Sequence, residues 1–168
     1  DDSTLLCCSN SGKVLVNTKT KDITTSPFGE FNEVSATLTD SKGRVWIAIY
    51  NKGIEVYEKD GTLICSYNTS NSNLSNNIVL CMDQRDSLVL AGTDGGGINL
   101  IDIDSGNITT LKHIPPPPPP PPAHSIKSIH VDQYGNIWAG SMRNGLINIS
   151  QSDIISYRDT HIGLTNGL

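Results

Sequence analysis

The segment Asp132-Gln-Tyr-Gly-Asn-Ile-Trp-Ala-Gly140 closely matches a segment 92 residues earlier, Asp40-Ser-Lys-Gly-Arg-Val-Trp-Ile-Ala48. A looser copy, Leu88-Val-Leu-Ala-Gly-Thr93, lies between them. Each copy is followed by a glycine and a short apolar run, and these glycines are Gly53, Gly97 and Gly145. Their spacing of 44 and 48 residues lies in the range of propeller blades, which bury their apolar faces only against neighbouring blades.

Each copy of the repeat divides into four short runs that are typical of β-strands. The runs are rich in β-branched and aromatic residues and are bounded by Gly, Asn, Asp and Ser. No segment keeps an apolar period of 3.6, so we expect almost no helix. The sequence therefore predicts an all-β chain of the β-propeller class. The expected strands are 34–38, 45–49, 54–57 and 63–67, then 78–82, 88–91, 98–101 and 108–111, and finally 126–131, 136–139, 146–149 and 154–157.

Both ends of the chain fall inside a repeat. Residues 5–8 with Gly12 match residues 46–49 with Gly53, and residues 164–166 match 74–76. We therefore expect a partial propeller of about three and a half four-stranded blades, too few to close a ring of four to eight. The predicted units are a half blade (1–27), three blades (28–73, 74–121 and 122–163) and the start of a further blade (164–168).

The repeated residues have predicted structural roles. Asp40 and Asp132 each begin an Asp-x-x-Gly turn, in which the carboxylate accepts backbone amides and glycine takes the positive φ. Trp46 and Trp138 occupy the same position in their repeats, where a large ring can pack between adjacent blades. Truncation of a buried tryptophan to alanine would cost about 3–5 kcal/mol.

Composition excludes several classes of protein. The net charge is −5 and the pI about 5.2, and Lys and Arg form no cluster, so no nucleic-acid or anionic-membrane partner is expected. No apolar run approaches membrane-spanning length, and the first residues do not resemble a signal peptide. The four cysteines (Cys7, Cys8, Cys65 and Cys81) show no metal-ligand spacing; we expect buried free thiols, with a Cys65–Cys81 disulfide as the alternative.

One low-complexity segment interrupts the repeats. Residues 115–122 are eight consecutive prolines between the second and third copies. Such a run can form a polyproline II rod that binds SH3 or WW domains, although an ordinary connection between blades is the simpler interpretation.

No enzyme, metal or cofactor motif stands out. The four histidines are scattered, and none accompanies a nucleophile in a recognisable elbow, so no catalytic residue is assigned. Residues 93–97 are glycine-rich but join two strands, which favours a hairpin over a phosphate loop. Residues 102–107 begin like a calcium loop but lack its later ligands, which favours a turn. We therefore expect neither a metal nor a cofactor.

Polar residues precede two of the predicted first strands. In propellers the first strand of each blade is innermost, so its entry loop lies near the mouth of the central channel. Asn76 and Asn77 precede one first strand, and His124 and Ser125 precede another. Amides and hydroxyls suit a polar ligand such as an oligosaccharide. The alternative is that these residues only satisfy the backbone of their turns.

The repeat unit, best seen over 126–149 and again over 34–57, resembles the two-component regulator propeller repeat. Ala48 replaces the usual glycine, and the turn of the middle copy has degraded to Asp83-Gln-Arg-Asp-Ser87. The resemblance implies the periplasmic sensor region of a Bacteroides-type hybrid two-component histidine kinase. It further implies a glycan ligand, a second propeller, a homodimeric parent, and a kinase outside this segment.

Two other functions stay open. A lyase-like propeller enzyme would need a histidine near a general acid or base, and His130 is the only histidine in a predicted strand. A protein-interaction platform would need no small ligand at all.

Overall fold

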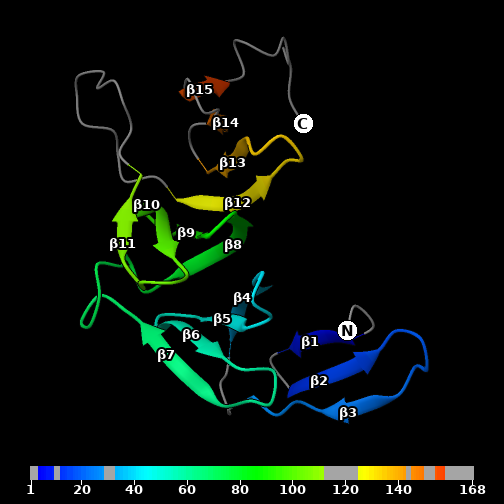
Figure 1. Cartoon of the computed structure of the whole chain (residues 1–168). Coiled ribbons are helices and arrows are strands. Elements are labelled where there is room, and N and C mark those ends of the chain that lie inside the picture. Colours follow the sequence, from blue (N-terminus) through cyan, green and yellow to red (C-terminus); the bar gives the residue numbers. More distant parts are fainter. Residues whose placement is uncertain are drawn as a thin grey trace.

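The computed structural model describes residues 4–9, 12–28, 33–111, 125–142, 145–149 and 154–157. In this part of the chain there are fifteen strands and no helix, arranged in four antiparallel sheets (Figure 1). The first sheet contains β1 (Thr4–Ser9), β2 (Gly12–Asn17) and β3 (Ile23–Thr25), and its strands pair in chain order. The predicted all-β class is therefore confirmed.

The other three sheets each have four strands, paired in chain order. The second sheet contains β4 (Val34–Thr39), β5 (Val45–Ile49), β6 (Gly53–Tyr57) and β7 (Leu63–Tyr67). The third contains β8 (Val79–Arg85), β9 (Leu88–Thr93), β10 (Gly97–Asp102) and β11 (Ile108–Thr110). The fourth contains β12 (Ile126–Val131), β13 (Ile137–Ser141), β14 (Gly145–Ile149) and β15 (Ile154–Tyr157). All twelve predicted strands form, with ends that shift by up to three residues.

The sheets pack side by side, so the inner strands are buried on both faces. On β5, Ile47 and Ile49 pack in a cluster with Leu6 and Leu15 of the first sheet. Trp46, on the opposite face of β5, belongs to a cluster that includes residues of the third sheet. This explains why such strands are continuously apolar instead of alternating.

The two tryptophans share one bonding pattern but differ in burial. Trp46 is 1% exposed between the second and third sheets, and its ring stacks on Tyr67 with centroids 5.8 Å apart. Its predicted place between two sheets is confirmed. Leu90 takes the equivalent place between the third and fourth sheets. Trp138 lies on the face of the fourth sheet that points away from the third, and its ring is only partly buried.

The Asp-x-x-Gly turns form as predicted. Asp40 Oδ1 accepts the amides of Lys42 and Arg44, each at 2.9 Å, and Gly43 has a φ of 82°. Asp132 Oδ1 accepts the amides of residues 134 and 136 in the same way. The sequence did not indicate a second role for these carboxylates. Each also accepts the indole N–H of its own tryptophan, at 2.8 Å in the second sheet and 3.0 Å in the fourth.

The first strands of the three four-stranded sheets lie next to one another, β4 beside β8 and β8 beside β12. Ser35 Oγ donates to the carbonyl of Val79 at 2.5 Å, and Cys81 Sγ lies 3.6 Å from the carbonyl of Ile126. Each first strand carries a register shift after its first residue, at Val34, Val79 and Ile126. The three first strands are therefore bulged at the same position of their repeats.

Candidate ligand-binding rim

The entry loops of the first strands and the hairpins between second and third strands meet at one end of the sheets. Three equivalent backbone bonds join them: Tyr50 N to Glu33 O, Asp94 N to Ile78 O, and Met142 N to Ser125 O, at 2.9–3.0 Å. We call the residues at these junctions the entry rim, meaning Glu33, Tyr50, 76–78, Asp94, Ser125 and Met142. The rim contains the candidate ligand residues that the structure describes.

Asp94 links two of the predicted site residues. Asn76 Nδ2 donates to the Asp94 carbonyl at 2.7 Å, and Ser125 Oγ donates to the Asp94 carboxylate. Asn76 Oδ1 also accepts the amide of Ile78 at 2.8 Å. Asn76 comes from the loop before β8, Asp94 from the β9–β10 hairpin, and Ser125 from the start of β12. The rim therefore brings Asn76 and Ser125 together across the third and fourth sheets.

Asn77 connects the rim to the second sheet. Its Oδ1 accepts the amide of Thr69 at 2.8 Å, and its carbonyl accepts the amide of Gly53 at 3.0 Å. Both asparagines thus use their side-chain oxygens within the loops, as the turn interpretation predicts. Among the described residues, no hydrogen bond is formed by Asn77 Nδ2 or by Asp94 Oδ2. The fourth candidate, His124, lies outside the described residues.

A buried polar cluster holds the rim from beneath. Asn99 on β10 is fully buried; its Oδ1 accepts the amide of Ser75 at 3.0 Å, and its Nδ2 donates to Ser75 Oγ at 2.8 Å. Ser75 Oγ also lies 3.3 Å from Thr93 Oγ1. A buried polar group is costly unless it is paired, so this cluster specifies one position for the loop before β8. The one sequence signal for it was an asparagine at an inward position of an apolar strand.

The motifs rejected from sequence form turns. Asp102 Oδ1 accepts the amides of Asp104 and Ser105 and the Ser105 hydroxyl, so this segment is an Asx turn. The glycine-rich residues 93–97 span the β9–β10 hairpin. No three potential metal-ligand side chains cluster in the described segments. The cysteines are free, so the alternative of a Cys65–Cys81 disulfide is not realised. The polyproline run lies outside the described residues.

His130 has a carboxylate nearby. Its Nδ1 lies 3.6 Å from Asp83 Oδ2 on β8, while the same oxygen accepts the amide of Val131 at 2.7 Å. The His130 side chain is 75% exposed, so water screens the pair. Asp83 therefore contacts β12 in two places: it accepts the backbone amide of Val131, and it lies near the imidazole of His130.

The sheets define a class of fold, an array of antiparallel meanders packed side by side as in propellers. Neither a protein-family model nor a curated protein matches the sequence. None of the described segments forms an apolar helix of membrane-spanning length.

Solved structures share the fold. The extracellular domain assigned to the hybrid two component system BT3049 of B. thetaiotaomicron matches 92% of this chain with a TM-score of 0.71 at 17% identity. The extracellular domain assigned to the one component system BT4673 of the same organism matches 94%, with a TM-score of 0.73 at 17% identity. This chain spans only 22% and 23% of those two chains. The computationally designed protein Ika4 matches 94% of this chain at 12% identity and a TM-score of 0.63, over 86% of its own length.

Proposed function

We propose that this chain is part of the periplasmic sensor region of a hybrid two-component system. The observation that carries the proposal is the shared fold, over 92% and 94% of the chain, with extracellular domains assigned to bacterial signalling systems. In this proposal the chain itself is not an enzyme. A histidine kinase elsewhere in the parent protein would supply the catalytic step.

The parent protein would provide the partners of this segment. About three and a half blades would join further blades to complete one propeller, and a second propeller would follow. The parent would act as a homodimer, since a kinase is switched most simply by a change between two arrangements of paired subunits. A ligand drives such a change only if it binds one arrangement more tightly than the other.

The entry rim is the proposed ligand site, and a polar ligand such as an oligosaccharide suits its chemistry. Asn77 Nδ2 can donate a hydrogen bond, and Asp94 Oδ2 and Ser125 Oγ can accept one. The half-exposed ring of Tyr50 adds an apolar surface at the same end of the sheets. Because Asp94 already bridges the third and fourth sheets, a ligand held there would tighten the contact between them.

Calorimetric titration of the full periplasmic region with a panel of oligosaccharides tests this function. A binding sugar should lose at least about tenfold in affinity when Asp94 is replaced by Asn, because a hydrogen bond to a charged group contributes roughly 1.5–3 kcal/mol. The matched control is Asp104→Asn, an exposed carboxylate at the opposite end of the sheets that pairs with Lys42. Equal losses in both variants, or no heat with any sugar, would contradict the rim as a glycan site.

An enzymatic function is a second candidate, favoured only by the proximity of His130 to Asp83. A lyase-like reaction would use His130 as a base. Turnover of an acidic polysaccharide that disappears in the His130→Ala variant would support it, and unchanged turnover would remove His130 from the reaction.

A further inference from the structure

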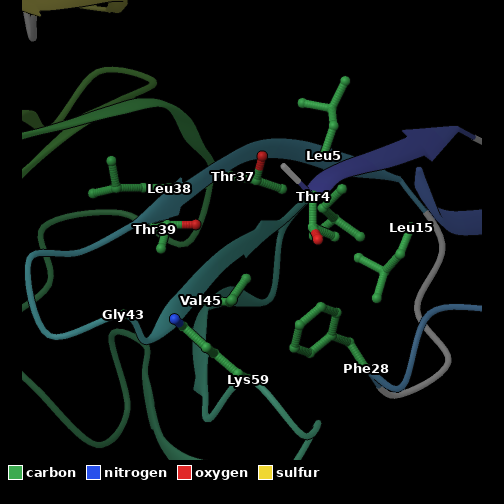
Figure 2. A pocket seen from close by; sticks show the side chains of 11 residues that line it. Thr4, Leu5, Leu15, Phe28, Thr37, Leu38, Thr39, Gly43, Val45 and Lys59 are labelled. Atoms are coloured by element: carbon green, nitrogen blue, oxygen red, sulfur yellow. The ribbon is translucent and has the colours of Figure 1, made fainter. Parts of the chain in front are cut away.

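A cleft of about 540 Å³ lies between the first two sheets (Figure 2). Leu6 and Leu15 line it from the first sheet, and Val45 and Gly43 line it from the second. Gly43 lies in the turn before β5, whereas Tyr50 of the entry rim follows the end of β5. The cleft is therefore at the opposite end of the sheets from the entry rim and is a separate site.

The cleft is open because its side chains are smaller than those at the next junction between sheets. Leu6 pairs with Leu15 in the first sheet, just as Trp46 pairs with Val56 in the second. Trp46 is 1% exposed and fills the junction between the second and third sheets. A leucine in the place of this indole leaves part of the first junction open.

Two further replacements make the first junction polar. Met82 packs against the core between the second and third sheets, and Thr37 takes its place three residues after the start of β4. Ile103 is buried in the same core, and Lys59 takes its place six residues after the start of β6. The first junction therefore has a hydroxyl and an ammonium group where the next has two apolar side chains.

Lys59 lies at the mouth of the cleft without a charged partner. Its turn packs on Pro27, since a Cβ on Gly61 would lie 2.4 Å from the Pro27 carbonyl oxygen. Its side chain passes over Gly43, where an added Cβ would lie 2.8 Å from Lys59 Cε and 3.3 Å from Nζ (Figure 2). Among the described residues, no carboxylate forms an ion pair with Lys59. The cleft therefore carries a positive charge that no described side chain neutralises.

The rest of the lining combines an apolar surface with hydroxyl groups. Leu15, Phe28 and Val45 provide the apolar part. Thr37 and Thr39 are exposed, and no hydrogen bond joins either hydroxyl to another described residue. Small-molecule sites typically have a volume of roughly 300–1,000 Å³ and an apolar lining with a few polar groups that orient the ligand. The cleft has this size and this composition.

We propose that the cleft binds a small amphipathic carboxylate. The apolar body of the ligand lies on Leu15, Phe28 and Val45, and its carboxylate accepts a hydrogen bond from Lys59 Nζ. The charge of Lys59 selects this class, because an uncharged ligand of the same shape leaves the ammonium group without a counter-ion. The proposal goes beyond the sensor function, since it does not require a sugar at the entry rim.

Calorimetric titration with 4-phenylbutyrate and with the uncharged 4-phenylbutanol tests the charge requirement, in the same periplasmic region as the sugar titration. The acid should bind at least about fivefold more tightly than the alcohol, because a hydrogen bond between charged groups is stronger than a neutral one. Lys59→Met keeps the length of the side chain and removes its charge, so it should make the two affinities equal. The matched control is Lys42→Met, which removes an ammonium group that pairs with Asp104 outside the cleft and should keep the difference.

A second variant tests the location of the site. Thr37→Met introduces the side chain that Met82 has at the next junction, so it should fill the cleft and weaken binding of both ligands at least about tenfold. The matched control is Thr109→Met, a change at an exposed threonine of β11, which should leave both affinities unchanged. Absence of binding, equal affinity for acid and alcohol, or unchanged acid binding in either Lys59→Met or Thr37→Met would overturn the proposal. Any of these results leaves the sensing function to be decided by the sugar titration.

Discussion

Replacement of Asp40 by asparagine should destabilise the protein far more than the same change at Asp132. Asp40 is 4% exposed, and its Oδ2 accepts Trp46 Nε1 at 2.8 Å and Arg44 Nε at 2.7 Å, with Arg44 Nη2 at 2.6 Å. Asparagine keeps the shape of the side chain but has only one oxygen. If that oxygen accepts the turn amides, the NH₂ group faces the Trp46 and Arg44 donors; if it faces those donors, the turn amides lose their acceptor.

The size of the effect follows from burial. Leaving a buried cation and an indole N–H without their acceptor should cost about 3 kcal/mol, between the value of one charged hydrogen bond and that of a broken buried ion pair. Asp132 makes the same turn and accepts hydrogen bonds from Trp138 and Asn136, but it is only partly buried, and no arginine among the described residues pairs with it. Its replacement should cost clearly less, because water can replace the lost acceptor.

Urea unfolding followed by tryptophan emission measures both losses. The chain has two tryptophans, so a Trp138→Phe background makes Trp46 the only reporter for Asp40, and Trp46→Phe does the same for Asp132. Addition of Arg44→Leu to Asp40→Asn should recover part of the loss, since it removes a cation that has lost its carboxylate and retains only the carbonyl of Ile103. Equal losses at the two aspartates, or less than about 1 kcal/mol at Asp40, would refute the argument from burial.

Three further outcomes are expected. Burial opposes ionisation of Asp40, but hydrogen bonds from Trp46 and Arg44 outweigh it and lower its pKa, and hydrogen bonds from Trp138 and Asn136 lower the pKa of Asp132 to about 2. Stability from both aspartates should therefore be complete above about pH 4, measured by acid titration of the melting temperature. The contribution of Asp132 should be lost as the pH falls through about 2, and that of Asp40 as the pH falls through its own lowered pKa. Asn99→Ala should cost about 2 kcal/mol in urea unfolding and loosen hydrogen exchange around Ser75, whereas an unchanged exchange pattern would remove Asn99 as the anchor of that loop. Burial raises the pKa of Cys81 to about 11, so at pH 8 its alkylation should be about a hundredfold slower than that of an ordinary thiol, and an equal rate by mass spectrometry would contradict the burial.

Much of the fold could be predicted because the repeat carries its own local signals. Turn residues such as Asp40 and Asp132 accept hydrogen bonds from amides two to four residues away, and the short apolar runs between such turns predict strands. The seam position of Trp46 followed from its spacing within the repeat. The turns and strands depend on contacts that are close in sequence, and the position of Trp46 depends on a pattern that recurs in each repeat.

Contacts between repeats could not be predicted in the same way. The Asn99–Ser75 bonds join residues 24 positions apart, and Asp94 meets Ser125 across 31 positions. Both depend on how two sheets are placed, which no local pattern specifies. The hydrogen bond from the Trp46 indole to Asp40 could be predicted only if the strand register were known. Nothing in the sequence pointed to it, because the turn already accounted for the carboxylate. The sequence therefore indicated Asn76, Asn77 and Ser125 as entry-loop residues, but it indicated neither Asp94 nor the hydrogen bonds that Asp94 makes with Asn76 and Ser125.

The two tryptophans lie in different surroundings, so their fluorescence should respond differently to binding. Trp46 is already enclosed between two sheets, so its emission should stay constant whatever binds at the ends of the array. Trp138 keeps part of its ring in water on the last sheet, so anything that covers that face should shift its emission toward the blue. Packing of a further sheet on that face could thus be followed by the intrinsic fluorescence of Trp138, without an attached dye.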